Sequence, residues 1–140
     1  MNPVETTLDI DSFEDVLIST VVLKNPATGA PTPASIDVLG PEHPARKKLL
    51  LDRIRKNRNQ FQRTGKVEVS DPEDDIADET EILVACTVGW TGLTQSGQPL
   101  AYSADAARAL YTDPKRHWLR GQIKKSLDEV ERFIASSSPT

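Results

Sequence analysis

Residues 88–114 read VGWTGLTQSGQPLAYSADAARALYTDP, and this stretch determines how the second half of the chain folds. Trp90 and Tyr102 flank a polar loop, and their rings can pack back over the alanine-rich helix that follows. Pro99 stiffens the return of the loop because its ring fixes φ. Ser103 suits the helix start, since its hydroxyl oxygen can accept a hydrogen bond from a free backbone N–H group. The stretch therefore predicts a loop whose role is structural, because its side chains pack against the helix that follows.

The preceding segment 16–39 is expected to form a β-hairpin. Residues 16–23 are rich in β-branched side chains, and residues 35–39 alternate with the period of a strand. Residues 25–29 supply proline and glycine for the turn. An isolated hairpin is marginally stable in water, so this one must lie against helices or pair with strands of another chain.

Four helices are predicted after the hairpin, over residues 44–64, 72–88, 103–111 and 114–134. Pro44 suits a first helical turn and Gly65 suits a helix end. The second helix is expected to begin with a cap between Ser70 and Pro72. An apolar stripe at helical spacing runs along the last helix through Leu119, Ile123, Leu127, Val130 and Ile134.

Together these elements predict an α+β fold, with an N-terminal β-hairpin followed by a mainly α-helical bundle of about four helices. We expect one domain over residues 16–135, because 140 residues lie within the size range of a single domain. Residues 1–15 are expected to form a flexible lead and residues 136–140 a disordered tail, since polar and proline-rich segments bury little apolar surface.

The chain carries one cysteine, Cys86, so an internal disulfide framework is excluded and a reducing compartment is expected. No apolar run approaches the roughly 20 residues that span a bilayer, and the N-terminal segment is acidic. These features predict an intracellular protein without membrane insertion.

The net charge of −4 conceals two adjacent blocks of opposite sign. Residues 46–66 hold nine of the 17 basic residues, and residues 68–81 hold eight of the 21 acidic residues. The blocks could pair with each other within the chain or between subunits, or the basic helix could dock an acidic protein. Nucleic-acid binding is the less favoured reading, because Phe61 is the only aromatic residue near these cations and stacking surfaces need several.

We find no catalytic, cofactor-binding or metal-binding residues in the sequence, and we expect no enzymatic activity. Metal ligation would rest on His43, His117 and Cys86, which form no local cluster. Neither a nucleophile turn nor a phosphate-binding loop is present. The simpler interpretations are a turn role for His43, a surface or packing role for His117 and a small buried side chain for Cys86.

The stretch that begins at Val88 resembles the pattern of the tail assembly chaperones of long-tailed, siphovirus-like bacteriophages. That pattern has a tryptophan, two residues, an apolar residue, a polar loop with Gly-x-Pro and an apolar-x-aromatic-Ser/Thr run. A short helix ending in leucine follows, then Asp-Pro and an aromatic residue. The resemblance covers about 45 residues of the C-terminal half. The corresponding residues are Trp90, Leu93, Gly97, Pro99, Leu100, Tyr102, Ser103, Leu110, Asp113, Pro114 and Trp118.

This resemblance implies a role in which the protein binds the tape measure protein and helps to recruit tail tube protein during tail assembly. It also implies action in the host cell cytoplasm and absence from the mature virion. We expect homo-oligomers, formed through the hairpin edge or exposed helix stripes. Helix-in-groove recognition is the expected mode. The candidate partner-binding residues are Arg53, Arg55, Arg58, Ile123, Leu127, Val130, Phe133 and Ile134.

Two other functions remain open. The chain could be a structural tail or head–tail joining protein that stays in the virion. It could also be a small nucleic-acid-binding regulator that uses the basic helix at residues 46–66.

Overall fold

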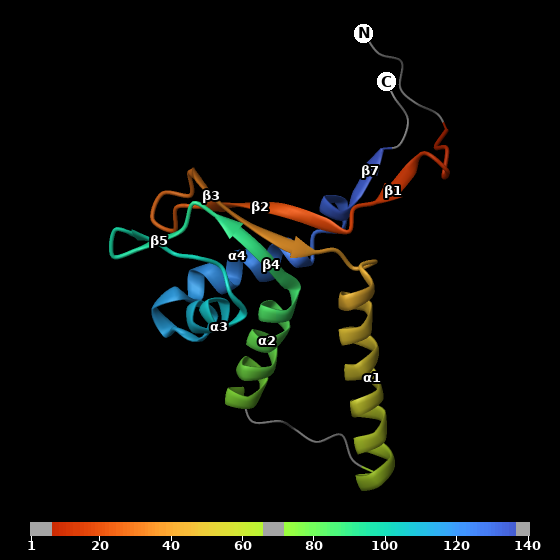
Figure 1. The fold of residues 1–140 in the computed structure, drawn as a ribbon. Helices are drawn as coiled ribbons and strands as arrows, with labels where there is room; N and C mark the ends of the chain where they lie inside the picture. The colour runs from red at the N-terminus through yellow and green to blue at the C-terminus, as the bar shows by residue number, and fades with distance from the viewer. Residues whose placement is uncertain (1–6, 66–71, 137–140) are drawn as a thin grey trace.

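The computed structural model describes residues 7–65 and 72–136, and within them a three-stranded antiparallel sheet is covered on one face by helices (Figure 1). The strand order is β2-β3-β4, so that β3 is central. Ile36 of β3 pairs with Val21 of β2 on one side and with Trp90 of β4 on the other. The strands are β2 (Ile18–Lys24), β3 (Pro31–Leu39) and β4 (Thr87–Thr91).

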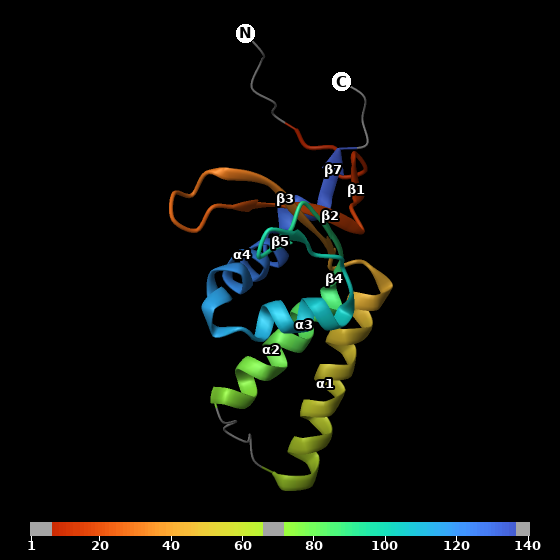
Figure 2. The same ribbon diagram turned by 60° about the vertical axis from the view of Figure 1, so that its left-hand side comes forward.

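The helices differ in how they relate to the sheet. α2, α3 and α4 gather beneath it, whereas α1 leaves from the end of β3 and extends away from the sheet (Figures 1 and 2). The helices are α1 (Pro44–Thr64), α2 (Pro72–Cys86), α3 (Ala104–Thr112) and α4 (His117–Leu127), with short 3₁₀ helices η1 (Pro114–Arg116) and η2 (Val130–Phe133).

Two short ladders complete the fold. β1 (Phe13–Asp15) pairs antiparallel with β7 (Ile134–Ser136), which joins the two ends of the described chain. β5 (Thr94–Gln95) and β6 (Gln98–Pro99) form a small hairpin within the loop that follows β4. None of the helices within the described ranges is both long and apolar enough to cross a membrane.

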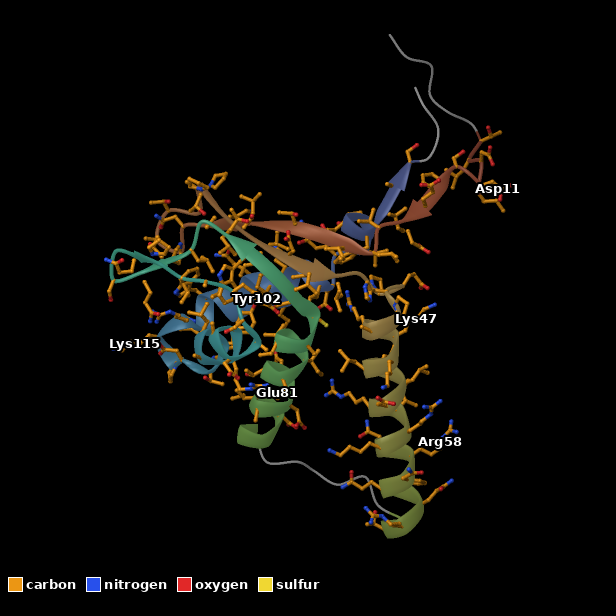
Figure 3. The ribbon with its side chains drawn as sticks, viewed as in Figure 1. Asp11, Lys47, Arg58, Glu81, Tyr102 and Lys115 are labelled. Atoms are coloured by element: carbon orange, nitrogen blue, oxygen red, sulfur yellow. The ribbon has the colours of Figure 1, made fainter. Side chains whose placement is uncertain are left out.

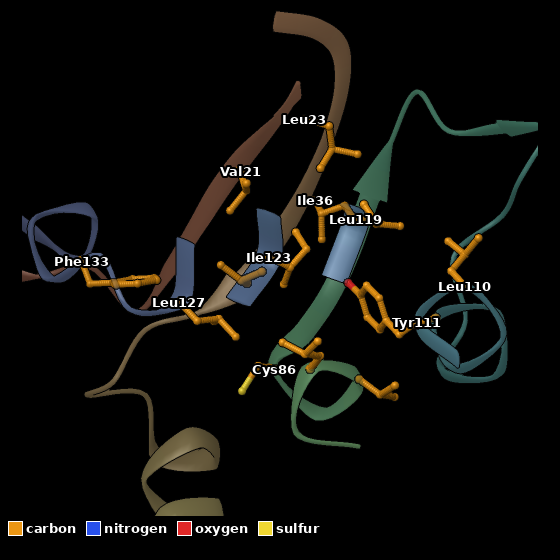
Figure 4. Close-up of a cluster of buried hydrophobic side chains, with 14 residues drawn as sticks. Val21, Leu23, Ile36, Cys86, Leu110, Tyr111, Leu119, Ile123, Leu127 and Phe133 are labelled. Atoms are coloured by element: carbon orange, nitrogen blue, oxygen red, sulfur yellow. The ribbon is translucent and has the colours of Figure 1, made fainter. Parts of the chain in front are cut away.

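The core lies between the sheet and its three helices (Figure 4). Strand alternation sends Val21, Leu23, Ile36 and Val38 toward the helices, while Val22 points to the open face. The helices and η2 contribute Leu83, Val84, Cys86, Ala107, Leu110, Tyr111, Leu119, Ile123, Leu127 and Phe133.

The α+β class is confirmed, with the N-terminal hairpin followed by four helices, two of which lie close to their predicted bounds. The helix predicted over 44–64 begins at Pro44 and ends at Thr64, and its C-cap is Gly65, whose φ of 66° is the left-handed conformation that favours glycine. The helix predicted over 103–111 is α3, capped by Ser103 as expected. The predicted caps between Ser70 and Asp71 lie outside the described residues.

Four boundaries were wrong. The helix predicted over 72–88 ends at Cys86, because the next five residues pair with β3 and remove one of the hairpin's two open edges. The helix predicted over 114–134 ends at Leu127, after which η2 turns Phe133 into the core. The lead predicted over 1–15 contains β1, and β7 includes Ser136 from the predicted tail.

Gly40 lies where three segments approach one another closely. Its N–H donates to the Leu17 carbonyl oxygen at 2.7 Å, and the Val16 N–H donates to the Phe133 carbonyl oxygen at 2.8 Å. A Cβ atom on residue 40 would overlap the Val16 carbonyl oxygen and lie 2.9 Å from Cδ1 of Phe133. Glycine is therefore required here because it has no side chain.

Gly40→Ala is expected to lower the free energy of unfolding by about 1–3 kcal/mol, because the added methyl group overpacks this junction. Gly121→Ala is the matched control within α4, where an added Cβ atom has nothing within 4 Å. There alanine should be neutral or stabilise by up to about 1 kcal/mol. Urea unfolding followed by tryptophan fluorescence measures both variants. Equal stability of Gly40→Ala and wild type would contradict the close approach.

Candidate functional site

The residues that carry the family resemblance pack around Trp90. The Trp90 indole N–H donates to the Leu100 carbonyl oxygen at 2.8 Å, and its ring meets Tyr102 edge-on with centroids 5.0 Å apart. The Tyr102 hydroxyl donates to the Thr87 carbonyl oxygen at 2.8 Å. These contacts close the loop after β4 into a folded unit, which we call the Trp90 clasp (Trp90, Leu93, Leu100 and Tyr102).

The turn at the tip of this loop accounts for Gly97 in the motif. Ser96 and Gly97 both have positive φ, 52° and 79°, which is the backbone geometry of a two-residue hairpin turn matched to the strand twist. The Leu100 N–H then donates to the Leu93 carbonyl oxygen at 2.9 Å. Pro99 forms the last residue of β6 opposite Thr94. The loop is therefore closed by backbone pairing as well as by its aromatic rings.

The rest of the motif begins and packs the following helices. The Ser103 hydroxyl accepts from the Ala106 N–H at 3.0 Å, and the Asp113 carboxylate accepts from the Lys115 N–H at 2.9 Å. Pro114 takes the first position of η1. Leu110 is buried and Trp118 is half-buried against the core.

Motif side chains also line a shallow surface pocket of about 250 Å³. Its apolar wall comes from Leu93, Leu100, Leu110 and Trp118, and Lys115 also lines it. Most of the motif's contacts are internal, which makes the clasp a scaffold that shapes this face of the molecule.

A buried hydroxyl pair lies beneath the clasp. Thr87 Oγ1 donates to the Leu83 carbonyl oxygen at 2.8 Å, so the Tyr111 hydroxyl, also 2.8 Å away, donates to Thr87. Both side chains are buried. Burial raises the pKa of Tyr111 to about 12, because removal from water disfavours the phenolate.

α1 presents a long uncovered surface. It spans 21 residues, and none of them is buried. Leu50, Ile54 and Phe61 are 59%, 46% and 53% exposed, and their spacing places them on one side of the helix. We call these three side chains the α1 stripe. In Figure 3 the side chains of α1, including Arg58, project from the helix into open space.

Basic side chains flank the α1 stripe. Helical geometry places Arg53 on one side of it and Arg58 on the other. α1 carries eight basic residues and one acidic residue, Asp52. Asp52 lies 3.8 Å from Arg55. Within the described residues no ion pair forms with Lys48, Arg53, Lys56, Arg58 or Arg63.

The acidic helix α2 does not neutralise these cations among the described residues. Its Glu79 lies 3.1 Å from Lys124 of α4, and its Glu81 lies 2.8 Å from Arg108 of α3. Intramolecular pairing of the two charge blocks, one of the alternatives raised by the sequence, is therefore absent from the described part of the chain.

Arg46 fastens the base of α1 to the body of the protein. Its guanidinium donates to the carbonyl oxygens of Leu39 and Leu127, each at 2.9 Å, and lies 5.5 Å from the centre of the Phe133 ring. The sequence places Arg46 in the basic block but gives no signal of this role, because its partners are backbone carbonyl groups, and Leu127 is distant in the chain. Beyond Arg46, Leu49 is the only apolar side chain of α1 packed against the core.

The structure divides the candidate partner-binding residues of the C-terminal segment. Ile123, Leu127 and Phe133 are buried in the core, so their assignment to a surface was wrong for this conformation. Val130 and Ile134 are 62% and 44% exposed, so their side chains remain accessible to a partner. The apolar stripe predicted along the last helix loses its helical continuity at Leu127, after which η2 places Phe133 in the core beside Arg46.

The residues considered for metal or thiol chemistry have local structural surroundings. His43 caps α1, its Nδ1 accepting from the Ala45 N–H at 3.1 Å, and His117 is exposed at the start of α4. Cys86 is buried, and burial raises the pKa of its thiol. Across residues 7–65 and 72–136, no three His, Cys, Asp or Glu side chains gather closely enough to hold a metal ion.

Comparison of the chain with protein families, with curated proteins and with solved structures finds no match.

Stability is expected to fall as pH rises from about 10 to about 12, because the unfolded chain ionises Tyr111 near its ordinary pKa while the folded chain holds the proton until about 12. Below pH 10 this contribution is fully present. Tyr111→Phe should reduce the loss between these pH values by up to about 1.4 kcal/mol per pH unit.

Urea unfolding at pH 9 and pH 11.5 measures this difference. Tyr102→Phe is the matched control, since it removes a tyrosine hydroxyl but keeps the buried Tyr111. The same alkaline loss in wild type and Tyr111→Phe would show that Tyr111 is not the responsible group.

Proposed function

We propose that this protein is a tail assembly chaperone of a long-tailed bacteriophage. It acts in the host cytoplasm, binds the tape measure protein before the tail tube polymerises, helps to recruit tail tube subunits and leaves before the virion is complete. The resemblance of residues 88–118 supports this assignment, and the packing of those residues into a scaffold is compatible with it.

The observation that carries the proposal is the surface of α1. A 21-residue helix with no buried residue and a half-exposed apolar stripe is suited to receive another helix. The tape measure protein is long and largely helical in the family that the chain resembles. Three half-exposed apolar side chains offer little contact area, so binding would be weak enough for tube subunits to displace it.

The α1 cations favour a second candidate function, nucleic-acid binding. Arg53, Arg55 and Arg58 lie within two turns of α1, and exposed cations of this kind can neutralise phosphates. α1 itself offers no stacking platform, because Phe61 is its one aromatic residue. We therefore rank protein binding above nucleic-acid binding.

The chaperone function can be tested by co-expressing the chain with the long helical protein encoded next to it in its genome. Co-purification is expected. Leu50→Gln, Ile54→Gln and Phe61→Gln combined should weaken association at least about tenfold, because three apolar contacts are lost. Ile76→Gln on α2 is the matched control, since Ile76 is 53% exposed and also helical. Wild-type protein that ignores this partner would contradict the proposal.

Two further measurements separate the rival functions. Mass spectrometry of purified particles should not detect the chain, whereas a structural tail or head–tail joining protein would be present. A salt-dependent mobility shift of DNA that disappears when Arg53, Arg55 and Arg58 are replaced would instead favour a nucleic-acid-binding regulator.

A further inference from the structure

The N-terminal arm, which we define as residues 7–15, is an exposed segment that combines apolar and acidic side chains. Leu8 and Ile10 are 69% and 80% exposed, and Phe13 is 46% exposed. Four acidic residues, Asp9, Asp11, Glu14 and Asp15, interleave with them, and the arm contains no basic residue. Its apolar side chains are unfavourably exposed to water, and its charge is opposite to that of α1.

The α1 stripe has the complementary chemistry. Its apolar side chains are exposed to a similar degree, and Arg53 and Arg58 lie beside them with no ion pair in the described chain. Opposite charges around apolar contacts favour one partner over others and speed its encounter. An acidic, apolar segment is therefore the occupant that fits this surface.

The two surfaces also match in length. From Leu50 to Phe61 the helix advances about 17 Å at 1.5 Å per residue. An extended chain from Leu8 to Phe13 spans about 17 Å at 3.3 Å per residue. Extending the arm requires opening the turn in which the Ser12 N–H donates to the Asp9 carbonyl oxygen and the Asp11 N–H donates to Asp9 Oδ1, each at 3.1 Å.

The arm and the α1 stripe of one chain do not face each other. The arm is fixed at Phe13, which pairs with Ser136, and it leaves the body on the side away from the free end of α1. Asp11 and Arg58 lie at opposite ends of the molecule in Figure 3. Docking between different copies avoids this geometric restriction.

We propose that the N-terminal arm of one copy docks on the α1 stripe of a second copy, so that the protein self-associates through these complementary surfaces. Reciprocal exchange of arms closes a dimer, and one-way exchange builds larger rings or chains. This inference does not depend on the proposed function. Where both hold, self-association covers the stripe until a helical partner competes for it.

A charge-exchange experiment tests the contact with the purified full chain alone. The arm variant is Asp9→Arg with Asp11→Arg, and the α1 variant is Arg53→Glu with Arg58→Glu. Each variant alone places like charges on arm and helix, so each should have a dissociation constant at least tenfold higher than wild type. An equimolar mixture of the two restores opposite charges at both contacts and should associate like wild type.

Sedimentation velocity across a range of protein concentrations, at low and high salt, measures association. All four positions are exposed, and circular dichroism checks that each variant folds. The matched control is Lys115→Glu with Lys125→Glu, which reverses two exposed cations outside α1 and should associate like wild type.

Three results would overturn the inference. Wild-type protein could stay monomeric at every concentration. Alternatively, each variant could self-associate as tightly as wild type, which would place the contact elsewhere, such as the open edge of β2. The mixture could also fail to recover association. None of these results bears on binding to the tape measure protein, so the two proposals fail independently.

Discussion

The fold depends on the direct passage of the chain from α2 into β4. The last turn of a helix leaves carbonyl groups without intrahelical partners, and here that turn enters the core. Thr87 supplies hydrogen-bond partners at this junction. Its hydroxyl donates to the Leu83 carbonyl oxygen and accepts from the Tyr111 hydroxyl, and its own carbonyl oxygen accepts from the Tyr102 hydroxyl. Because unpartnered buried polar groups are costly, this node holds α3 and the Trp90 clasp against the sheet.

The same junction accounts for the contrast between the packed body and α1. β4 completes the sheet, and α2, α3 and α4 cover its inner face, so α1 contributes no fully buried residue to the core. Arg46 and Leu49 attach only the first turns of α1. The remaining turns rely on caps at His43 and Gly65 and on intrinsic helix propensity, which alone give marginal stability. A partner on the exposed stripe would add the tertiary contacts that α1 lacks.

Local signals in the sequence predicted the elements that local chemistry controls. Proline, glycine and serine located both ends of α1 and the start of α3, and strand periodicity located the hairpin. β4 was missed because Val88 continues the apolar pattern of α2, and only pairing with β3 makes residues 87–91 a strand. Periodicity placed Ile123 and Leu127 on an apolar face correctly. It could not show that the sheet covers that face, since burial depends on residues far away in the chain.

Exposed apolar side chains lie among basic residues on α1 and among acidic residues on the N-terminal arm. A chain with net charge −4 would be expected to repel its copies weakly. Here the basic residues are concentrated on one projecting helix and acidic residues on an arm at the other end, so net charge is a poor guide to association. Contacts between such surfaces are screened by salt and desolvate few groups fully, which keeps them reversible. Reversibility is what a protein needs if the same apolar stripe is to be shielded at one stage and engaged at another.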